Sequence, residues 1–449
     1  MRRFALLLLL AAAASGHARA NPCAAGAYAS GTGDLVVLVP VPTIAPPGLR
    51  YLFRDGRRGS TLDADAPVQC HDGTVSVRAD DRAPIAWARL PLAETDALFT
   101  SLGTRLAGRL IEPTTPDATL PLVVMVHGSE RSPALASPYA YALAAQGIRV
   151  FVYDKRGTGA SEGEYTQNFE LLADDAAAAL GQARTMAQGR YARAGYYGGS
   201  QGGWVAPLAA TRSPADFVAV GFGLVVSPID EDREQMLDEA RTAGLGAGAE
   251  AAIERLSGAT ATLLTTHFAR GFEALDAIRR DPAAQRWIDR IHGEHSGAML
   301  RTADADLRRV GRARFDNVEL IWDYDARAAL ERLRVPLLWV LAEQDREAPI
   351  ARTRDVLVAL AGAGQPVDVY LFPDTDHGMF EFTTRADGSR QPTRVTDGYL
   401  CLLGDWIKGT PEDRYGRGVR LTGGDRPPRR REVAPSSHPP ISTDERNAR

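Results

Sequence analysis

The chain has 449 residues, of which 45% are hydrophobic and 24% are charged, and its formal net charge is −4. This is the composition of an ordinary globular protein, long enough for one large domain with additions. Because basic residues are not in excess, the composition argues against nucleic acid as a partner. None of the Cys and His residues has the spacing of a metal site, so we expect no metal and no cofactor.

Residues 1–20 are typical of a secretory signal, with Arg2-Arg3, an apolar run and a final Ala18-Arg19-Ala20. The apolar run is shorter than the roughly 18 to 20 residues that cross a bilayer. Cleavage after Ala20 is therefore favoured over a membrane anchor, and no stable membrane insertion is expected afterwards. Loss of the three arginines of this segment changes the net charge from −4 to −7.

A cleaved signal predicts export to the periplasm or the cell exterior. Cys23 follows the cleavage site, but Asn21-Pro22 does not fit the small-residue pattern of a lipoprotein, so a lipid anchor is the lesser alternative. In an oxidising compartment, Cys23 and Cys70 are a plausible disulfide pair. Cys401 lies alone in a later apolar stretch.

Residues 21–100 form a predicted β-rich accessory region. They are rich in Pro and Gly and contain short β-type runs, such as Leu35–Val39 and Thr74–Val77, separated by turn signals.

The sequence then changes to an alternation of short apolar runs and helical stretches. Buried parallel strands are typically short and apolar throughout. Predicted helices at Tyr139–Gln146 and Glu170–Gln188 separate some of them. The alternation predicts an α/β fold with a doubly wound, mostly parallel sheet, in two parts, 101–229 and 333–408. The predicted strands are Leu120–Val126, Arg149–Tyr153, Ala194–Tyr197, Phe217–Val226, Val335–Leu341 and Val367–Phe372.

Two further segments depart from this alternation. Residues 230–332 have long amphipathic tracts, such as Gln235–Leu256 and Phe272–Ile291, and predict a helical insert over the carboxyl edge of the sheet. A separate helical domain remote from any site is the alternative. Residues 409–449 are rich in Arg, Pro, Gly and Ser and predict a disordered tail.

The most informative motif is Gly198-Gly199-Ser200-Gln201-Gly202, which lies between a predicted strand and a helix-permissive stretch. This is the layout of a nucleophile elbow, in which small neighbours let the chain turn sharply and expose the serine Oγ. Ser200 is therefore the candidate nucleophile. A Gly-rich turn with a solvated serine would be the alternative if the motif stood alone.

A second turn, His127-Gly128-Ser129-Glu130, follows the Leu120–Val126 strand. Its backbone N–H groups can point at a developing oxyanion, so we expect the amides of Ser129 and Gln201 to form an oxyanion hole. We expect His127 to support this turn with Gly128 rather than to act as a base.

A serine nucleophile needs an imidazole base and a carboxylate that orients it. Asp345 and His377 each follow a predicted strand and stand in the order nucleophile, acid, base. The loops after parallel strands converge on one crevice. For the acid, Glu343 is an alternative, and Asp345 could instead cap a helix that begins near Ala348. Asp374 and Asp376 are expected to form turns.

Together these motifs, with the stretch from Tyr153 through Asp154-Lys155-Arg156 to Ser161, resemble an α/β-hydrolase over about residues 105–407. The resemblance is to secreted bacterial hydrolases of the dienelactone hydrolase, serine aminopeptidase and prolyl-oligopeptidase-like groups. It implies an eight-stranded sheet, a Ser-His-Asp triad and a lid inserted where the helical stretch falls. It also implies that Asp154 and Arg156 organise backbone near the site, with substrate contact by Arg156 as an alternative.

The chain departs from that pattern at Glu130, where relatives often have a small residue. A carboxylate facing the crevice would oppose anionic substrates, so we expect Glu130 to point away or to pair with Arg131. The expected function is hydrolysis of a small-molecule ester. A peptidase or amidase, a thioesterase or acyltransferase, and a silent binding protein on the same fold are the alternatives.

Overall fold

The computed structural model describes residues 23–40, 48–71, 73–78 and 83–422. The predicted signal peptide, residues 1–20, lies outside the described residues, as does the part of the predicted tail from 423 onward.

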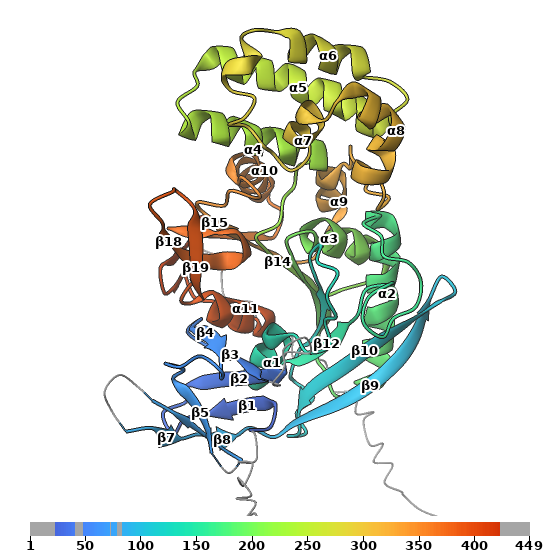
Figure 1. Cartoon of the computed structure of the whole chain (residues 1–449). Coiled ribbons are helices and arrows are strands. Elements are labelled where there is room, and N and C mark those ends of the chain that lie inside the picture. The colour runs from blue at the N-terminus through green and yellow to red at the C-terminus, as the bar shows by residue number, and fades with distance from the viewer. Residues whose placement is uncertain (1–22, 41–47, 72, 79–82, 423–449) are drawn as a thin grey trace, which may run out of the picture.

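A large twisted sheet forms the centre of the molecule (Figure 1). It has ten strands in the order β20-β21-β16-β15-β14-β13-β11-β12-β10-β9. All neighbours from β12 to β16 pair in parallel, and the strands at both edges pair antiparallel. The strands are β9 Leu92–Ser101, β10 Thr104–Pro113, β11 Leu122–Val126, β12 Arg149–Tyr153, β13 Ala194–Gly199, β14 Phe217–Gly221, β15 Leu337–Ala342, β16 Val367–Phe372, β20 Arg414–Tyr415 and β21 Gly418–Arg420.

Helices cover both faces of this sheet. The parallel strands are buried on both sides, and their residues alternate between two cores, with Val124 facing one and Val123 the other. The first core packs against α2 (Phe169–Met186), α3 (Gly202–Arg212), α9 (Ala326–Arg332) and α10 (Ala351–Gly362). The second core packs against α1 (Pro138–Ala145) and α11 (Tyr399–Lys408). This arrangement confirms the predicted doubly wound α/β-hydrolase fold, with ten strands in the sheet where the resemblance implied about eight.

The N-terminal residues form two small sheets, of order β4-β3-β2-β1-β8 and β5-β6-β7. A disulfide between Cys23 and Cys70 joins their ends, with Cα atoms 5.3 Å apart. The larger of these sheets packs on α1 through residues such as Val37 and Leu52. The strands are β1 Gly26–Ala29, β2 Leu35–Pro40, β3 Leu49–Phe53, β4 Arg58–Ser60, β5 Val68–His71, β6 Thr74–Val77, β7 Ile85–Ala86 and β8 Ala88–Arg89.

The predicted boundary at residue 100 is wrong, because it falls inside β9. That strand pairs along its whole length with β10 and is the outer strand of the large sheet. Most of its residues are exposed or half-buried, with Phe99 and Ser101 buried, as expected of an edge strand that is only partly covered.

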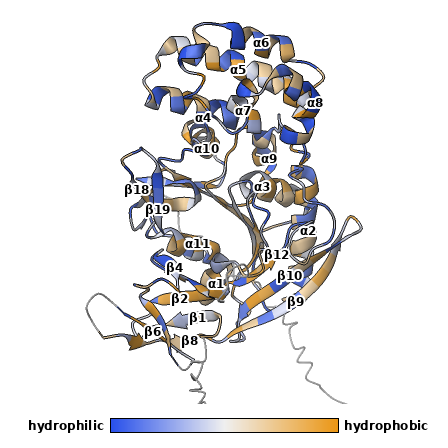
Figure 2. Cartoon of the chain, in the orientation of Figure 1, coloured by the Kyte–Doolittle hydropathy of each residue, from blue (hydrophilic) through white to orange (hydrophobic). Residues whose placement is uncertain are grey.

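Between β14 and α9, the chain forms a group of helices with a hydrophobic core of its own (Figure 1). Figure 2 shows hydrophilic residues over much of α6 and α8 on the outside of this group. The predicted tract Gln235–Leu256 is broken, because the backbone has positive φ at Gly244 and Gly246. The helices are α4 Pro228–Thr242, α5 Ala247–Thr265, α6 Phe272–Arg280, the 3₁₀ turn η1 Ala284–Arg286, α7 Ser296–Arg301 and α8 Asp304–Phe315.

The prediction of a disordered tail from residue 409 is wrong for its first part. Residues 414–420 form the β20–β21 hairpin, in which β21 pairs with β16. Arg420 donates to Asp368 on β16 at 2.5 Å, and the Thr422 hydroxyl accepts from the Val369 amide. The prediction of disorder rested on the small number of apolar residues in this segment, but polar contacts such as these hold it against the sheet.

A small sheet that the sequence did not predict lies beyond β16. It has the order β17-β18-β19, made of Thr375–Asp376, Phe380–Thr384 and Arg390–Val395, with the 3₁₀ turn η2, His377–Met379, between its first two strands. Within the described residues, no helix combines the length and the apolar character that crossing a membrane requires.

Candidate active site

Ser200 lies at a sharp turn between β13 and α3. Its φ is +51°, a left-handed conformation that is strained for a residue with a side chain. Close packing explains two of the flanking glycines: a Cβ on Gly198 would lie 2.3 Å from the Gly202 carbonyl oxygen, and a Cβ on Gly202 would lie 2.5 Å from that of Val126. Ser200 is thus held in the conformation of a nucleophile elbow.

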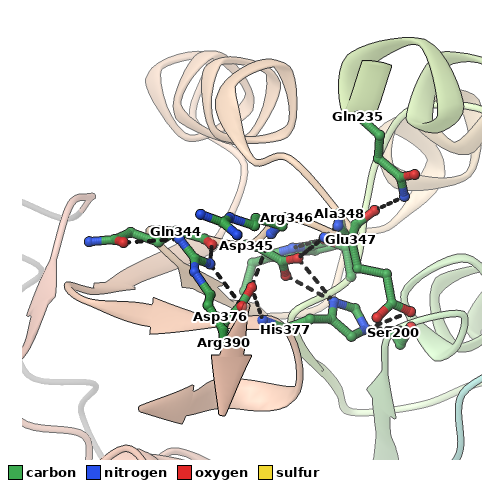
Figure 3. Close-up of polar contacts among 12 residues, drawn as sticks. Ser200, Gln235, Gln344, Asp345, Arg346, Glu347, Ala348, Asp376, His377 and Arg390 are labelled. Carbon is green, nitrogen blue, oxygen red and sulfur yellow. Dashed lines mark hydrogen bonds and ion pairs between the residues drawn. The ribbon is translucent and has the colours of Figure 1, made fainter. Parts of the chain in front are cut away.

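The three predicted catalytic side chains form one line of hydrogen bonds (Figure 3). The Nε2 atom of His377 is 3.1 Å from Ser200 Oγ, and its Nδ1 atom is 2.9 Å from Asp345 Oδ2. With Nδ1–H donating to the buried carboxylate, Nε2 is left to accept the serine proton. Ser200 and Asp345 follow β13 and β15, and His377 begins η2 in the segment beyond β16, so all three lie at the carboxyl edge of the sheet.

Asp345 both orients the histidine and holds its own loop. Its Oδ1 atom accepts from the amides of Glu347 at 3.0 Å and Ala348 at 2.7 Å. The alternative role as a turn cap is therefore present together with the contact to His377. Glu343 is directed elsewhere, because its carboxylate accepts from the Asp374 amide.

The charges around His377 favour its protonated form. Burial alone would lower the pKa of His377, but the hydrogen bond and charge of Asp345, with the charges of Glu347 and Asp376, raise it above its ordinary value. Glu347 Oε1 is 3.6 Å from His377 Nε2. This imidazole is therefore a stronger base than a free histidine.

The predicted oxyanion turn lies beside the nucleophile. A Cβ on Gly128 would be 3.3 Å from Ser200 Cβ, which is closer than most Cβ contacts, so glycine suits this approach. Ser129 follows it, and Gln201 follows Ser200 at the first turn of α3, where its carbonyl accepts from the amide of Trp204. The N-terminus of a helix favours negative charge, which suits an oxyanion at this position.

His127 is directed behind the turn. Its Nε2 atom is 2.6 Å from the Tyr153 carbonyl oxygen, to which the neutral ring donates. Burial and the charge of Lys155 lower the pKa of His127 and keep it neutral. This placement is that of a support for the turn.

Asp154 and Arg156 organise backbone separately. Asp154 accepts from the amides of Ala134 at 2.7 Å and Ala160 at 2.9 Å, and so joins the loops after β11 and β12. Arg156 forms a two-point pair with the buried Asp175 of α2, at 2.7 and 2.5 Å. That pair engages the guanidinium and explains its burial without a substrate contact.

Glu130 folds back over the oxyanion turn. One carboxylate oxygen lies 2.8 Å from the place that a Cβ on Gly128 would take. The expected pairing with Arg131 is absent among the ion pairs of the described residues; Arg131 instead lies over the Tyr165 ring, 4.3 Å from its centroid.

The sequence motifs assign no role to several residues of the site. Phe222 has its ring 5.1 Å from that of His377, and Arg390 on β19 pairs with Asp376 at 2.8 Å, next to the histidine. Lys155 and Tyr165 contact the oxyanion turn. All of these contacts join segments that are far apart in the sequence, so no local motif marks them.

The helical insert touches the acid loop. Gln235 on α4 donates to the Glu347 carbonyl (Figure 3), and Asp230 on the same helix pairs with Arg352 of α10 at 3.2 Å. These contacts place α4 next to the catalytic side chains rather than in a remote domain. In the part of the chain that the structure describes, no group of three or more His, Cys, Asp or Glu side chains could hold a metal ion.

No curated protein matches the sequence. Among solved structures, the esterase Pf2001 of Pyrococcus furiosus is 13% identical over 64% of this chain and 85% of its own, with a TM-score of 0.39. Brefeldin A esterase, a bacterial homologue of human hormone-sensitive lipase, is 18% identical over 65% and 70%, with a TM-score of 0.41. Acylaminoacyl peptidase of Pyrococcus horikoshii is 13% identical over 74% of this chain and 44% of its own, with a TM-score of 0.40.

The comparison with family models is more direct, because it covers the site itself. The model of the family Serine aminopeptidase, S33, matches residues 117–381, which is more than half of the chain. The matched segment includes Ser200, Asp345 and His377. The chain therefore belongs to the serine aminopeptidase S33 family of the α/β-hydrolase superfamily and is a serine hydrolase.

Proposed function

We propose that the protein hydrolyses carboxylic esters of small molecules through an acyl-enzyme on Ser200. The observation that carries this proposal is the hydrogen-bonded line from Ser200 Oγ through His377 to the buried Asp345. A hydroxyl is a poor nucleophile at neutral pH, and this line supplies the base that it needs.

The reaction has two half-steps. In the first, His377 Nε2 takes the proton of Ser200 as Oγ attacks the ester carbonyl, and the amides of Ser129 and Gln201 hold the oxyanion. Asp345 stabilises the imidazolium, which then gives its proton to the departing alcohol. In the second, His377 deprotonates water, which attacks the acyl-enzyme and releases the acid and free Ser200.

An ester requires less catalytic assistance from this site than an amide does. An alcohol departs with less protonation than an amine does, so the triad and the two amides suffice. We expect hydrolysis of short nitrophenyl esters with His377 as the single proton carrier.

A second candidate, an aminopeptidase, is favoured by the carboxylates at the crevice. Glu347 lies beside His377, and burial with the charges of Glu294, Glu347 and Asp345 raises the pKa of Glu231 on α4. A substrate with a free amino group would relieve the repulsion among these carboxylates. Such an enzyme would cleave aminoacyl arylamides but not their N-acylated forms.

The test compares nitrophenyl esters of increasing acyl length with free and N-acylated aminoacyl arylamides, on the intact protein and a Ser200→Ala variant. Loss of the nucleophile is expected to lower kcat by about 10⁴-fold or more. Labelling by a fluorophosphonate must disappear in the variant. Labelling that persists in Ser200→Ala overturns the mechanism. If the intact protein prefers free aminoacyl arylamides to esters, the proposed esterase function is wrong and the aminopeptidase function takes its place.

We also propose that the protein acts outside the cytoplasm. The signal-like residues 1–20 and the disulfide between Cys23 and Cys70 support this proposal, since disulfides persist in oxidising compartments. N-terminal sequencing of the protein from cells is expected to begin at Asn21. A chain that begins at Met1 in the cytoplasmic fraction would overturn it.

A further inference from the structure

Two side chains hold the oxyanion turn from behind. The Nζ atom of Lys155 donates to the Gly128 carbonyl oxygen at 2.5 Å, and the Tyr165 hydroxyl donates to the Ser129 carbonyl oxygen. Lys155 directly follows Asp154 in the loop after β12, so its contact with the turn spans 27 residues of sequence. Side chains of the neighbouring loop thus fix two successive carbonyls of the turn, those of Gly128 and Ser129.

The carbonyl that Lys155 holds belongs to the same peptide unit as the Ser129 amide. In a trans peptide, the C=O and N–H bonds point in opposite directions. A side chain that fixes the Gly128 oxygen on one side therefore fixes the direction of the Ser129 N–H on the other. A positive charge on the oxygen also polarises the unit, which strengthens the N–H as a donor.

Lys155 is an unusual residue for this place. It is 2% exposed, and burying an ammonium without compensation is costly. The chain has 52 Lys and Arg residues, and Lys155 and Lys408 are the only lysines among them. A compact ammonium at this buried position, in a chain with one other lysine, fits a point contact to one oxygen.

Four charged or titratable groups face the ammonium. Glu130 lies over the turn and favours the charged form, while Arg131 disfavours it. The neutral His127 lies behind the same turn, and the Tyr165 ring is 5.1 Å from Nζ. Burial is the largest influence and lowers the pKa of Lys155 to about 8.

We propose that Lys155 is a positioning residue of the oxyanion hole, which aims and polarises the Ser129 amide through the Gly128 carbonyl. The inference rests on the proposed function, because it concerns the same acyl transfer. Glu130 fits the proposal as the counter-charge of Lys155.

The first test is a Lys155→Met variant, which keeps the length of the side chain and removes its charge. Loss of an oxyanion donor costs about 10²- to 10³-fold in kcat, and loss of its support should cost about 10- to 100-fold. KM should change little, because the oxyanion forms only in the transition state. Lys408→Met is the matched control: its Nζ pairs with Asp405 at the surface of α11, and full activity is expected.

The second test uses the intact enzyme and needs no variant of Lys155. Labelling of lysine at the ε-carbon gives two NMR signals from residues 21–449, and Lys408→Met assigns them. The signal of Lys155 should titrate near pH 8, and kcat should fall to a lower plateau over the same range, because a neutral amine holds the carbonyl more weakly. A Lys155 titration with no change in kcat overturns the proposal.

The outcomes separate this inference from the proposed function. If the intact enzyme shows neither ester nor arylamide hydrolysis and no labelling of Ser200, the function fails. If the intact enzyme is active and Ser200→Ala is not, but a folded Lys155→Met matches the intact enzyme in kcat, only the inference fails. If Lys155→Met raises KM and leaves kcat unchanged, Lys155 acts in substrate binding and the inference is likewise overturned.

Discussion

At the scale of single residues, the base is surrounded by carboxylates. Asp345 contacts Nδ1 of His377, Asp376 accepts from its backbone amide, and Glu347 lies 3.6 Å from Nε2. The carboxylates of Asp345 and Asp376 have further partners in the site, whereas 58% of the Glu347 side chain is exposed. Glu347 can therefore change the strength of the base without building the site.

A Glu347→Gln substitution should lower the pKa of His377. That pKa is raised in part by the Glu347 charge, and the reaction needs neutral imidazole, so the acid limb of kcat/KM should move to lower pH. The pH profile of nitrophenyl ester hydrolysis measures this shift. Glu331→Gln on α9, whose charge pairs with Arg327 at the surface, should leave the limb in place. An acid limb that moves to higher pH in Glu347→Gln would contradict the assignment.

At the scale of elements, α2 is anchored to the loop that carries Lys155. Arg156 and Asp175 are 8% and 0% exposed and make two charge-assisted hydrogen bonds, while Arg156 also donates to Thr104 at 3.1 Å. The loop after β12 is thus attached both to the helix below it and to β10. Because Lys155 of this loop donates to the Gly128 carbonyl, the position of the loop affects the position of the oxyanion turn.

An Arg156→Met variant should lose about 3 to 5 kcal/mol of unfolding free energy, because Asp175 would be left as an unpaired buried charge. The shift of the urea midpoint measures this loss. Arg327→Met is the control, since its pair with Glu331 is 61% and 49% exposed and should contribute under about 1 kcal/mol. Equal midpoints for the two variants would show that the buried pair does not stabilise the fold.

The parallel strands of the sheet could be predicted from the sequence because both of their faces are buried. Short, mostly apolar runs mark them, and Arg149–Tyr153 and Val367–Phe372 agree with the structure at both ends. The edge strands β9 and β21 have one exposed side or only a few residues. Their pairing is decided by tertiary contacts, so their sequences resemble those of accessory or disordered segments.

The residues of the candidate site likewise fall into those that the sequence predicts and those that it does not. Ser200, Asp345 and His377 each stand next to a predicted strand end, and parallel topology brings such positions together. Glu347 lies in the loop of Asp345 and Lys155 in the loop after β12, and the sequence motifs assign no role to either of them. Their contacts with the Gly128 carbonyl and the His377 ring depend on how two loops meet, which no single stretch of sequence records.

At the scale of the whole molecule, the two N-terminal sheets are cross-linked by the disulfide between Cys23 and Cys70, which are 47 residues apart in the sequence. The sheets bury a small core around Val36 and Leu38, together with the disulfide, and contact the hydrolase sheet through α1. The disulfide thus closes a long loop in a region with little apolar surface of its own.

Reduction of this disulfide should destabilise the N-terminal sheets by about 2 to 4 kcal/mol, because the unfolded chain regains the freedom of the closed loop. Thermal unfolding with and without a reductant measures the change. A Cys23→Ser, Cys70→Ser double variant should be less stable and should no longer respond to the reductant. A protein whose first unfolding transition is the same in both conditions would contradict this role of the bond.

The β20–β21 hairpin has a further consequence at the border of the large sheet. Beneath it, β16 is a run of six residues, Val-Asp-Val-Tyr-Leu-Phe, with high strand propensity and five buried members. An uncovered edge of this kind is a template on which another chain can add a strand, and two residues of β21 occupy that place. The hairpin near the end of the described chain thus covers the edge of β16, and its removal is expected to favour self-association. A fragment ending at Gly409 would keep every catalytic side chain and lose this protection.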